Sequence, residues 1–117
     1  MSALLSKNQI LSLDDLEKEK VETPEWGGHV FIRQMTAMER DNYEAGLTGQ
    51  SKDNMMSNFR AKLVVRCCVD EKGERLFSDG DAPALGKKCS AVLVRLFNTA
   101  ERLNALGEAQ SEELKGN

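Results

Sequence analysis

Apolar residues recur at helical spacing near the end of the chain. In residues 88–106 they lie three or four positions apart and form one stripe, which predicts an amphipathic helix over this range. The stripe consists of Val92, Leu93, Leu96, Phe97, Ala100, Leu103 and Leu106. The residues expected to face away from the core are Arg95, Asn98, Glu101, Arg102 and Asn104.

A second apolar stripe predicts a central helix over about 54–69, capped by Asp53 or Asn54. Its spacing is i, i+4, i+5 and i+8, which places the apolar side chains on one face. The stripe consists of Phe59, Leu63, Val64, Cys67 and Cys68, and it is widened by Met55, Met56 and Val65.

Residues 18–34 have the pattern of a β-hairpin. Pro24 and the pair Gly27-Gly28 indicate a turn, and the block that follows is rich in β-branched and aromatic residues. We therefore predict that residues 18–23 pair with residues 28–34. Because a two-stranded hairpin is marginally stable in water, it must pack on helices or pair with another copy.

Thr36 and Glu39 have the spacing of a capping box and predict a helix that runs to about Leu47. A one-turn helix is expected near Pro83, with Asp81 as its cap. Residues 4–16 are compatible with a short helix but show no clean period.

These elements predict an α+β fold, mainly α, with an N-terminal β-hairpin packed on a small bundle of three to four helices. We expect residues 1–106 to form a single domain, because 117 residues leave no room for a second core of comparable size. Residues 107–117 are polar and acidic, and we expect them to be a disordered tail.

Aromatic residues make up 5% of the chain, within a hydrophobic content of 40%. The core must therefore consist mainly of aliphatic side chains and methionine, and it buries a modest area. At roughly 25 cal/mol per Å² of apolar surface, such a core narrowly offsets the entropy of the chain. Oligomerisation is a common remedy, so we expect self-association.

The net charge of −3 argues against nucleic-acid binding, since phosphate neutralisation needs clustered Lys and Arg and the longest basic run is Lys87-Lys88. No apolar stretch approaches the about 20 residues of a membrane span. The N-terminus lacks the pattern of a signal peptide. Together with an odd number of cysteines, these patterns predict a cytoplasmic protein without disulfides.

No residue pattern indicates catalysis, a cofactor or a metal, and we expect a protein that is not an enzyme. His29 has no partner at metal-ligand spacing. Cys67, Cys68 and Cys89 lie on or beside apolar stripes, which favours burial over reactivity. The acidic segment 70–81 fails the calcium-loop pattern, because the required residues are out of register.

Trp26 has two interpretations. In a turn it is either a plug at the end of the hairpin or an exposed anchor for a partner, since Trp is enriched in binding hot spots. The methionines of the chain are open to the same two interpretations, because methionine fills gaps in cores and also suits adaptable binding surfaces. Those concerned are Met35, Met38, Met55 and Met56.

Several short motifs follow one another in a specific order between residues 15 and 106. A charged strand leads to Pro24-Glu25-Trp26-Gly27-Gly28, then to Val30-Phe31-Ile32-Arg33, and then to Thr36-Ala37-Met38-Glu39-Arg40-Asp41. The second half continues with residues 58–64, 69–79 and 96–104. This order and spacing resembles that of the tail assembly chaperones of long-tailed, non-contractile bacteriophages.

The resemblance implies a non-catalytic protein that binds and shields the tape measure protein and helps to recruit tail tube subunits. It would act in the host cytoplasm and be absent from the mature virion. Members are often made in two lengths through a programmed ribosomal frameshift, and this chain would be the short form. Alternatives are a structural tail or head-completion component and a small adaptor unrelated to tails.

The contact residues for such a client are a hypothesis drawn from the residues themselves. We expect Trp26, Phe31, Met35 and Met38 to border the contact surface, because they are large apolar side chains on and after the hairpin. The free edge of the hairpin would allow copies to pair, and an apolar groove would hold a client helix.

Overall fold

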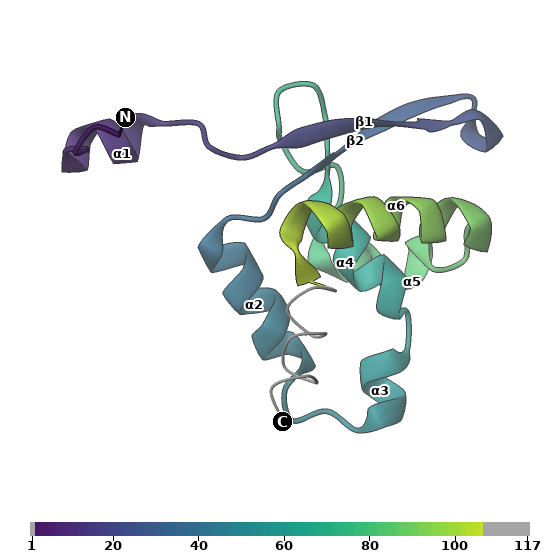
Figure 1. Cartoon of the computed structure of the whole chain (residues 1–117). Coiled ribbons are helices and arrows are strands. Elements are labelled where there is room, and N and C mark those ends of the chain that lie inside the picture. The colour runs from purple at the N-terminus through teal and green to yellow at the C-terminus, as the bar shows by residue number, and fades with distance from the viewer. Residues whose placement is uncertain (1, 107–117) are drawn as a thin grey trace.

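The computed structural model describes residues 2–106, in which a sheet lies over a group of helices (Figure 1). The predicted α+β fold, mainly α, with an N-terminal hairpin is confirmed. The elements in chain order are α1 (Lys7–Ser12), β1 (Lys18–Thr23), η1 (Pro24–Trp26), β2 (Gly28–Arg33), α2 (Ala37–Leu47), α3 (Lys52–Met56), α4 (Phe59–Cys67), β3 (Cys68–Val69), η2 (Asp79–Asp81), α5 (Ala82–Leu85) and α6 (Ser90–Asn104).

The hairpin forms as predicted. β1 pairs with β2 in antiparallel register, with Lys18 opposite Arg33 and Thr23 opposite Gly28. Between the strands lies a turn of 3-10 helix that ends at Gly27, whose φ of +80° suits glycine. β2 also pairs with β3, a two-residue strand that the sequence pattern did not predict. The order β1-β2-β3 makes β1 an edge strand among the described residues.

The predicted capping box starts α2. The Thr36 hydroxyl accepts a hydrogen bond from the Glu39 amide (3.1 Å), and the Glu39 carboxylate accepts one from the Thr36 amide (2.8 Å). The helix ends at Leu47, as predicted. At α5 the prediction fails in part, because the Asp81 carboxylate accepts from the Ser78 amide and does not cap α5.

The single central helix predicted over 54–69 is wrong. Asn58 adopts a left-handed backbone conformation with φ +52°, which Asn tolerates better than most residues. This residue separates α3 from α4. Ser51, and not Asp53 or Asn54, caps α3. As a result Met56 lies outside the core with 52% of its surface exposed, and it does not widen the buried stripe.

The predicted apolar stripe of α6 forms, and it packs on α4 and on β2 of the hairpin. Asn104 is an exception, because it was expected to face away from the core and is instead buried. The fully buried side chains come from β1, β2, α4, β3 and α6, and most of them are aliphatic. The largest of them are Ile32, Leu63, Leu96, Val64, Val65, Val69 and Val92.

Two of the three cysteines belong to this core. Burial raises the pKa of Cys67 and of Cys68 to about 12, so neither is a thiolate near neutral pH. Cys89, just before α6, is exposed, which corrects the expectation of burial for this residue. All three are free thiols.

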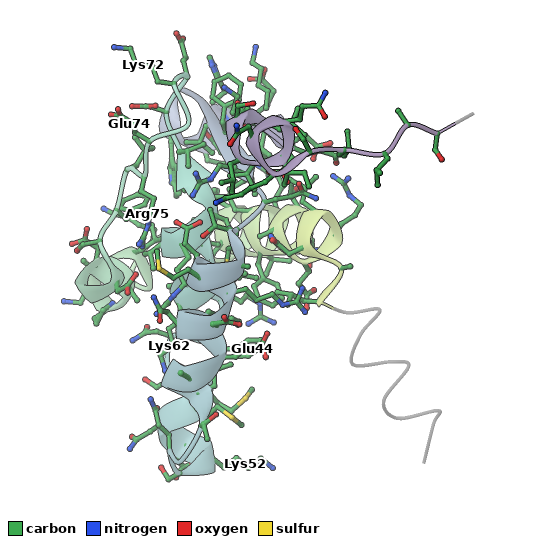
Figure 2. All side chains as sticks on the ribbon, turned by 90° about the vertical axis from the view of Figure 1, so that its left-hand side faces the viewer. Glu44, Lys52, Lys62, Lys72, Glu74 and Arg75 are labelled. Carbon is green, nitrogen blue, oxygen red and sulfur yellow. The ribbon has the colours of Figure 1, made fainter. Side chains whose placement is uncertain are left out.

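Charged side chains mark the outer ends of the molecule. Figure 2 shows Lys72 and Glu74 on the loop at one end and Lys52 at the opposite end, with Lys62 and Glu44 between them.

None of the helices in residues 2–106 is both long and apolar enough to cross a membrane. The predicted disordered tail, residues 107–117, lies outside the described residues.

Candidate functional site

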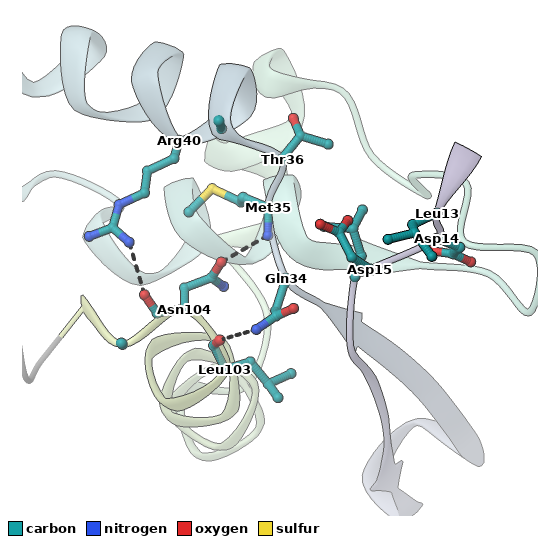
Figure 3. A pocket seen from close by; sticks show the side chains of 12 residues that line it. Leu13, Asp14, Asp15, Gln34, Met35, Thr36, Arg40, Leu103 and Asn104 are labelled. Carbon is teal, nitrogen blue, oxygen red and sulfur yellow. Dashed lines mark hydrogen bonds between the residues drawn. The ribbon is translucent and has the colours of Figure 1, made fainter. Parts of the chain in front are cut away.

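A groove opens where the chain enters the hairpin, beside the start of α2 and the end of α6 (Figure 3). Its volume is about 610 Å³. Leu16, Met35, Ala37 and Leu103 supply apolar atoms, while Asp14, Asp15 and Arg40 supply charge at its edge. We call it the junction groove. Its lining mixes apolar and polar side chains, with charged groups at the rim.

Three hydrogen bonds hold the segment after β2 against the end of α6. Gln34 Nε2 donates to the Leu103 carbonyl (2.9 Å), the Met35 amide donates to Asn104 Oδ1 (2.8 Å), and Arg40 donates to the Asn104 carbonyl (3.0 Å) (Figure 3). Two of these acceptors are carbonyls at the helix end, which have no partner within the helix. The walls of the junction groove are therefore fixed by polar contacts to backbone.

A largely buried ion pair, Arg33–Glu39, fixes the orientation of α2 relative to β2. The Arg33 guanidinium donates to both carboxylate oxygens of Glu39 (2.9 Å each), and both side chains are largely buried. Arg33 also donates to the Gly73 carbonyl (3.3 Å). Because the Glu39 carboxylate also completes the capping box of α2 by accepting from the Thr36 amide, it fixes both the helix start and its position against the sheet.

An apolar arm precedes the groove. We call residues 2–13 the N-terminal arm; it contains α1, and none of its residues is buried. Figure 1 shows α1 standing apart from the helices of the body. Its large apolar side chains are exposed by half or more, and they are Leu4, Leu5, Ile10, Leu11 and Leu13. A set of exposed apolar residues this large is a mark of an interaction surface.

The four residues predicted to contact a client do not lie together. Trp26 is at the hairpin turn with 39% of its surface exposed, and Met38 is on the first turn of α2 with 71% exposed. Phe31 is half-buried, with Lys18 Nζ 4.8 Å from its ring centre. Met35 is buried and lines the junction groove. The structure thus gives Trp26 and Met38 two separate exposed positions.

Sequence reasoning allowed a short helix within residues 4–16 but gave it no role, and it placed Asn104 on the outer face of the last helix. The five apolar residues of the arm show no clean period, so they gave no clear helical face. Ser6 and Gln9 have the spacing of a capping box, which the structure forms, and this signal could have located α1. Asn104 carried no signal, because its partner, the Met35 amide, is distant in the sequence.

The hairpin turn is tied to α6 by charge. The Arg95 guanidinium donates to both carboxylate oxygens of Glu25 (3.0 and 2.7 Å) and to the Glu22 carbonyl (3.1 Å). These hydrogen bonds lower the pKa of Glu25 to about 2. The contact holds the turn, and with it Trp26, in a defined place above α6.

The histidine and the cysteines do not line the junction groove. His29 is exposed and packs edge-on against Phe31, with ring centres 5.6 Å apart, and burial raises the pKa of Cys67 and Cys68 to about 12. Between residues 2 and 106 there is no group of three or more His, Cys, Asp or Glu side chains that could hold a metal ion. Core, groove and arm together define a small helical protein that carries apolar surface outside its core.

Comparison with known proteins identifies the family. The family model described as phage tail assembly chaperone matches residues 7–116, and the chain belongs to this family. Among solved structures, that of the bacteriophage HK97 tail assembly chaperone matches with a TM-score of 0.60 and 18% identity. The match covers 82% of this chain and 94% of the HK97 chain, and it shows a shared fold. No curated protein matches the sequence.

Proposed function

We propose that this tail assembly chaperone binds and shields the tape measure protein and helps to bring tail tube subunits to it. It would do so without catalysis, in the host cytoplasm, and would be absent from the mature virion. The observation that carries the proposal is the apolar surface outside the core, on the N-terminal arm, around the junction groove and at Trp26 and Met38. Membership of the tail assembly chaperone family supports a role for this surface in tail assembly.

The mechanism is helix-in-groove binding. A long helical client that exposes apolar faces needs a cover that excludes water, and apolar side chains inserted into a groove provide one. Many weak copies along one long partner give avidity without strong single contacts. Self-association of the chaperone would add to this effect, because neighbouring copies on one client would also hold each other.

Trp26 and Met38 are the best placed of the proposed contact residues. Both present apolar atoms to solvent, and neither contributes to the buried core. Met35 is buried and Phe31 is half-buried, so they offer a client less apolar surface than Trp26 and Met38. A Trp or Met side chain that enters an apolar pocket of the client would lose the water around it and gain dispersion contacts.

The test is co-expression of the full chain with the tape measure protein of the same phage. We expect the client to stay soluble and to co-purify with the wild-type chain, and we expect Trp26→Ala combined with Met38→Ala to weaken the complex about tenfold or more. Leu76→Ala is a matched control, because Leu76 is also half-exposed but lies on the loop after β3.

The helical circular-dichroism signal must be unchanged in all three proteins. If the double variant bound the client as well as the wild type, these contact residues would be wrong. If the client precipitated equally with and without the wild-type chain, the shielding role would be wrong. Finding the chain in purified virions would favour the alternative, a structural tail component.

A further inference from the structure

A second groove lies between α3, α4 and the start of α6, and it shares no lining residue with the junction groove. Its volume is about 340 Å³. Met56, Phe59 and Leu93 supply its apolar atoms, and 52% of the surface of Met56 is exposed. Phe59 leans on Phe97 in the core, with ring centres 5.4 Å apart. The floor of the groove is therefore apolar and is supported by packed core residues.

Two cationic side chains stand at the rim of this groove. Arg60 and Lys88 line it, both are exposed, and none of the lining residues is acidic. Neither side chain forms an ion pair with any other residue between 2 and 106. We call this lining, apolar floor and cationic rim together, the basic groove. An apolar segment that carries carboxylates would complement it.

The C-terminal segment of the chain has the matching composition. Residues 107–117 contain three glutamates and one lysine, for a net charge of −2. Their only large apolar side chain is Leu114, which directly follows Glu112 and Glu113. The family model matches residues 7–116, so its pattern includes nearly all of this segment. The segment thus combines one apolar anchor with two adjacent carboxylates, within the region that defines the family.

The end of α6 fixes where this segment starts. Ala105 ends the helix in a left-handed conformation with φ +54°, and its amide donates to the Arg102 carbonyl (3.3 Å). This backbone state is unfavourable for alanine, so contacts of the neighbouring chain must hold it. Leu106 packs against the core and supplies one such contact. The chain therefore leaves the axis of α6 from a fixed point beside the body.

From that point the basic groove is within reach. Leu93, on the floor of the groove, lies about 20 Å from Leu106 at the 1.5 Å rise per residue of a helix. The chain from Gly107 to Leu114 spans up to about 26 Å when extended. A segment that runs back beside α6 can therefore bring its leucine to the floor and its glutamates to the rim.

We propose that residues 107–117 fold back beside α6 and dock in the basic groove of the same chain, with Leu114 on the apolar floor and the two preceding glutamates at the cationic rim. The proposal replaces the disordered tail expected from composition. While docked, the segment keeps the groove closed to acidic, apolar segments of other proteins. The inference goes beyond the proposed function and does not depend on the identity of the client.

Crosslinking within the full chain tests this placement. Cys89 is exposed and lies between the groove residues Lys88 and Ser90, whereas the other two cysteines are buried. Gly116→Cys adds a second reactive thiol to the C-terminal segment. A short bismaleimide should then join the two thiols within one chain, and Cys89→Ser should abolish the product. The quantity measured is the initial rate of crosslinking, followed by mass spectrometry of the digested chain.

Charge reversal separates docking from chance encounters of a tethered segment. Glu112→Lys with Glu113→Lys should slow the crosslink at least about fivefold, because attraction to the rim becomes repulsion. Glu108→Lys is the control and should change the rate little, because the short chain before it does not reach the rim. Arg60→Glu with Lys88→Glu, added to the double lysine variant, should restore the parent rate. This rescue excludes a general effect on the fold.

The apolar anchor has its own test. Leu114→Ser removes the side chain proposed to cover the floor and should slow the crosslink about threefold or more. Ala109→Ser is the matched control, because it adds the same hydroxyl within the segment and removes no large apolar group. Equal rates in the two variants would show that the leucine does not dock.

A mixture of isotope-labelled and unlabelled chains decides whose segment occupies the groove. Docking within a chain gives crosslinked peptide pairs of one isotope only. Pairs of mixed isotope would show that the segment reaches a second copy and would overturn the proposal. A crosslinking rate that the double glutamate reversal leaves unchanged would overturn it too, as would the absence of any crosslink to Cys89.

Discussion

Two helices of this molecule, α1 and α4, are opposites in how they are stabilised. α1 has a complete capping box and buries none of its residues. α4 starts at Asn58, which makes no side-chain capping bond, yet it buries five of its nine residues. Local signals thus form the first helix, and tertiary packing forms the second.

The difference in burial shows that α4 stabilises the fold, whereas the apolar side chains of α1 remain accessible to other chains. Removal of an α4 side chain leaves a cavity in the core, whereas removal of an α1 side chain leaves the body unchanged. Apolar residues that contribute nothing to their own fold are costly to keep exposed, because they invite aggregation. We propose that in this tail assembly chaperone they serve as contact surface.

The largest expected effect separates the two helices directly. Leu63 of α4 is fully buried, so Leu63→Ala should lower the free energy of unfolding by about 3 kcal/mol. Leu11 of α1 is 72% exposed, and Leu11→Ala should change it by less than about 0.5 kcal/mol. Urea unfolding at low protein concentration measures the free energy of unfolding of each variant. Equal losses would mean that the arm packs on its own body.

The second effect concerns the junction between the body and the segment that enters α2. Asn104→Ala leaves the Met35 amide without its acceptor in a buried place, which should cost about 1–3 kcal/mol. Asn98 on the same helix is exposed, and Asn98→Ala is the matched control. Equal stability of the two variants in urea would show that Asn104 does not hold this junction.

The smallest effect is the pH dependence of the hairpin turn. The Arg95 hydrogen bonds lower the pKa of Glu25 to about 2 from an ordinary 4.5, so their stabilisation is fully present above about pH 4.5 and is lost as the pH falls toward 2. Glu25→Gln should lower Tm slightly at pH 6, and the difference from the wild type should vanish near pH 2. A difference that persists at pH 2 would contradict this assignment.

Much of the fold could be predicted because its signals are local. Pro24, Gly27 and the Thr36–Glu39 pair act on neighbouring backbone, and the hairpin and α2 follow from them. The break at Asn58 could not be predicted in the same way, since the apolar stripe continues through it. β3 was missed because it depends on a distant partner, β2.

The candidate surfaces were harder to predict than the fold. Trp26 and Met38 were identified by residue type, but an amino-acid pattern does not show that they lie apart. The role of Asn104 depends on a contact 69 residues away. The exposure of the arm depends on the folded body, which buries none of its residues, and residues 4–13 alone do not reveal it.

Hydrogen exchange on the full chain tests most directly whether the arm is reserved for other chains. In a dilute solution the amides of residues 7–12 should exchange quickly while those of α4 and α6 stay protected. At higher concentration, or with the tape measure protein, the arm amides should become protected and the core should not change. Arm amides that are protected at every dilution, or unprotected in every state, would contradict the account.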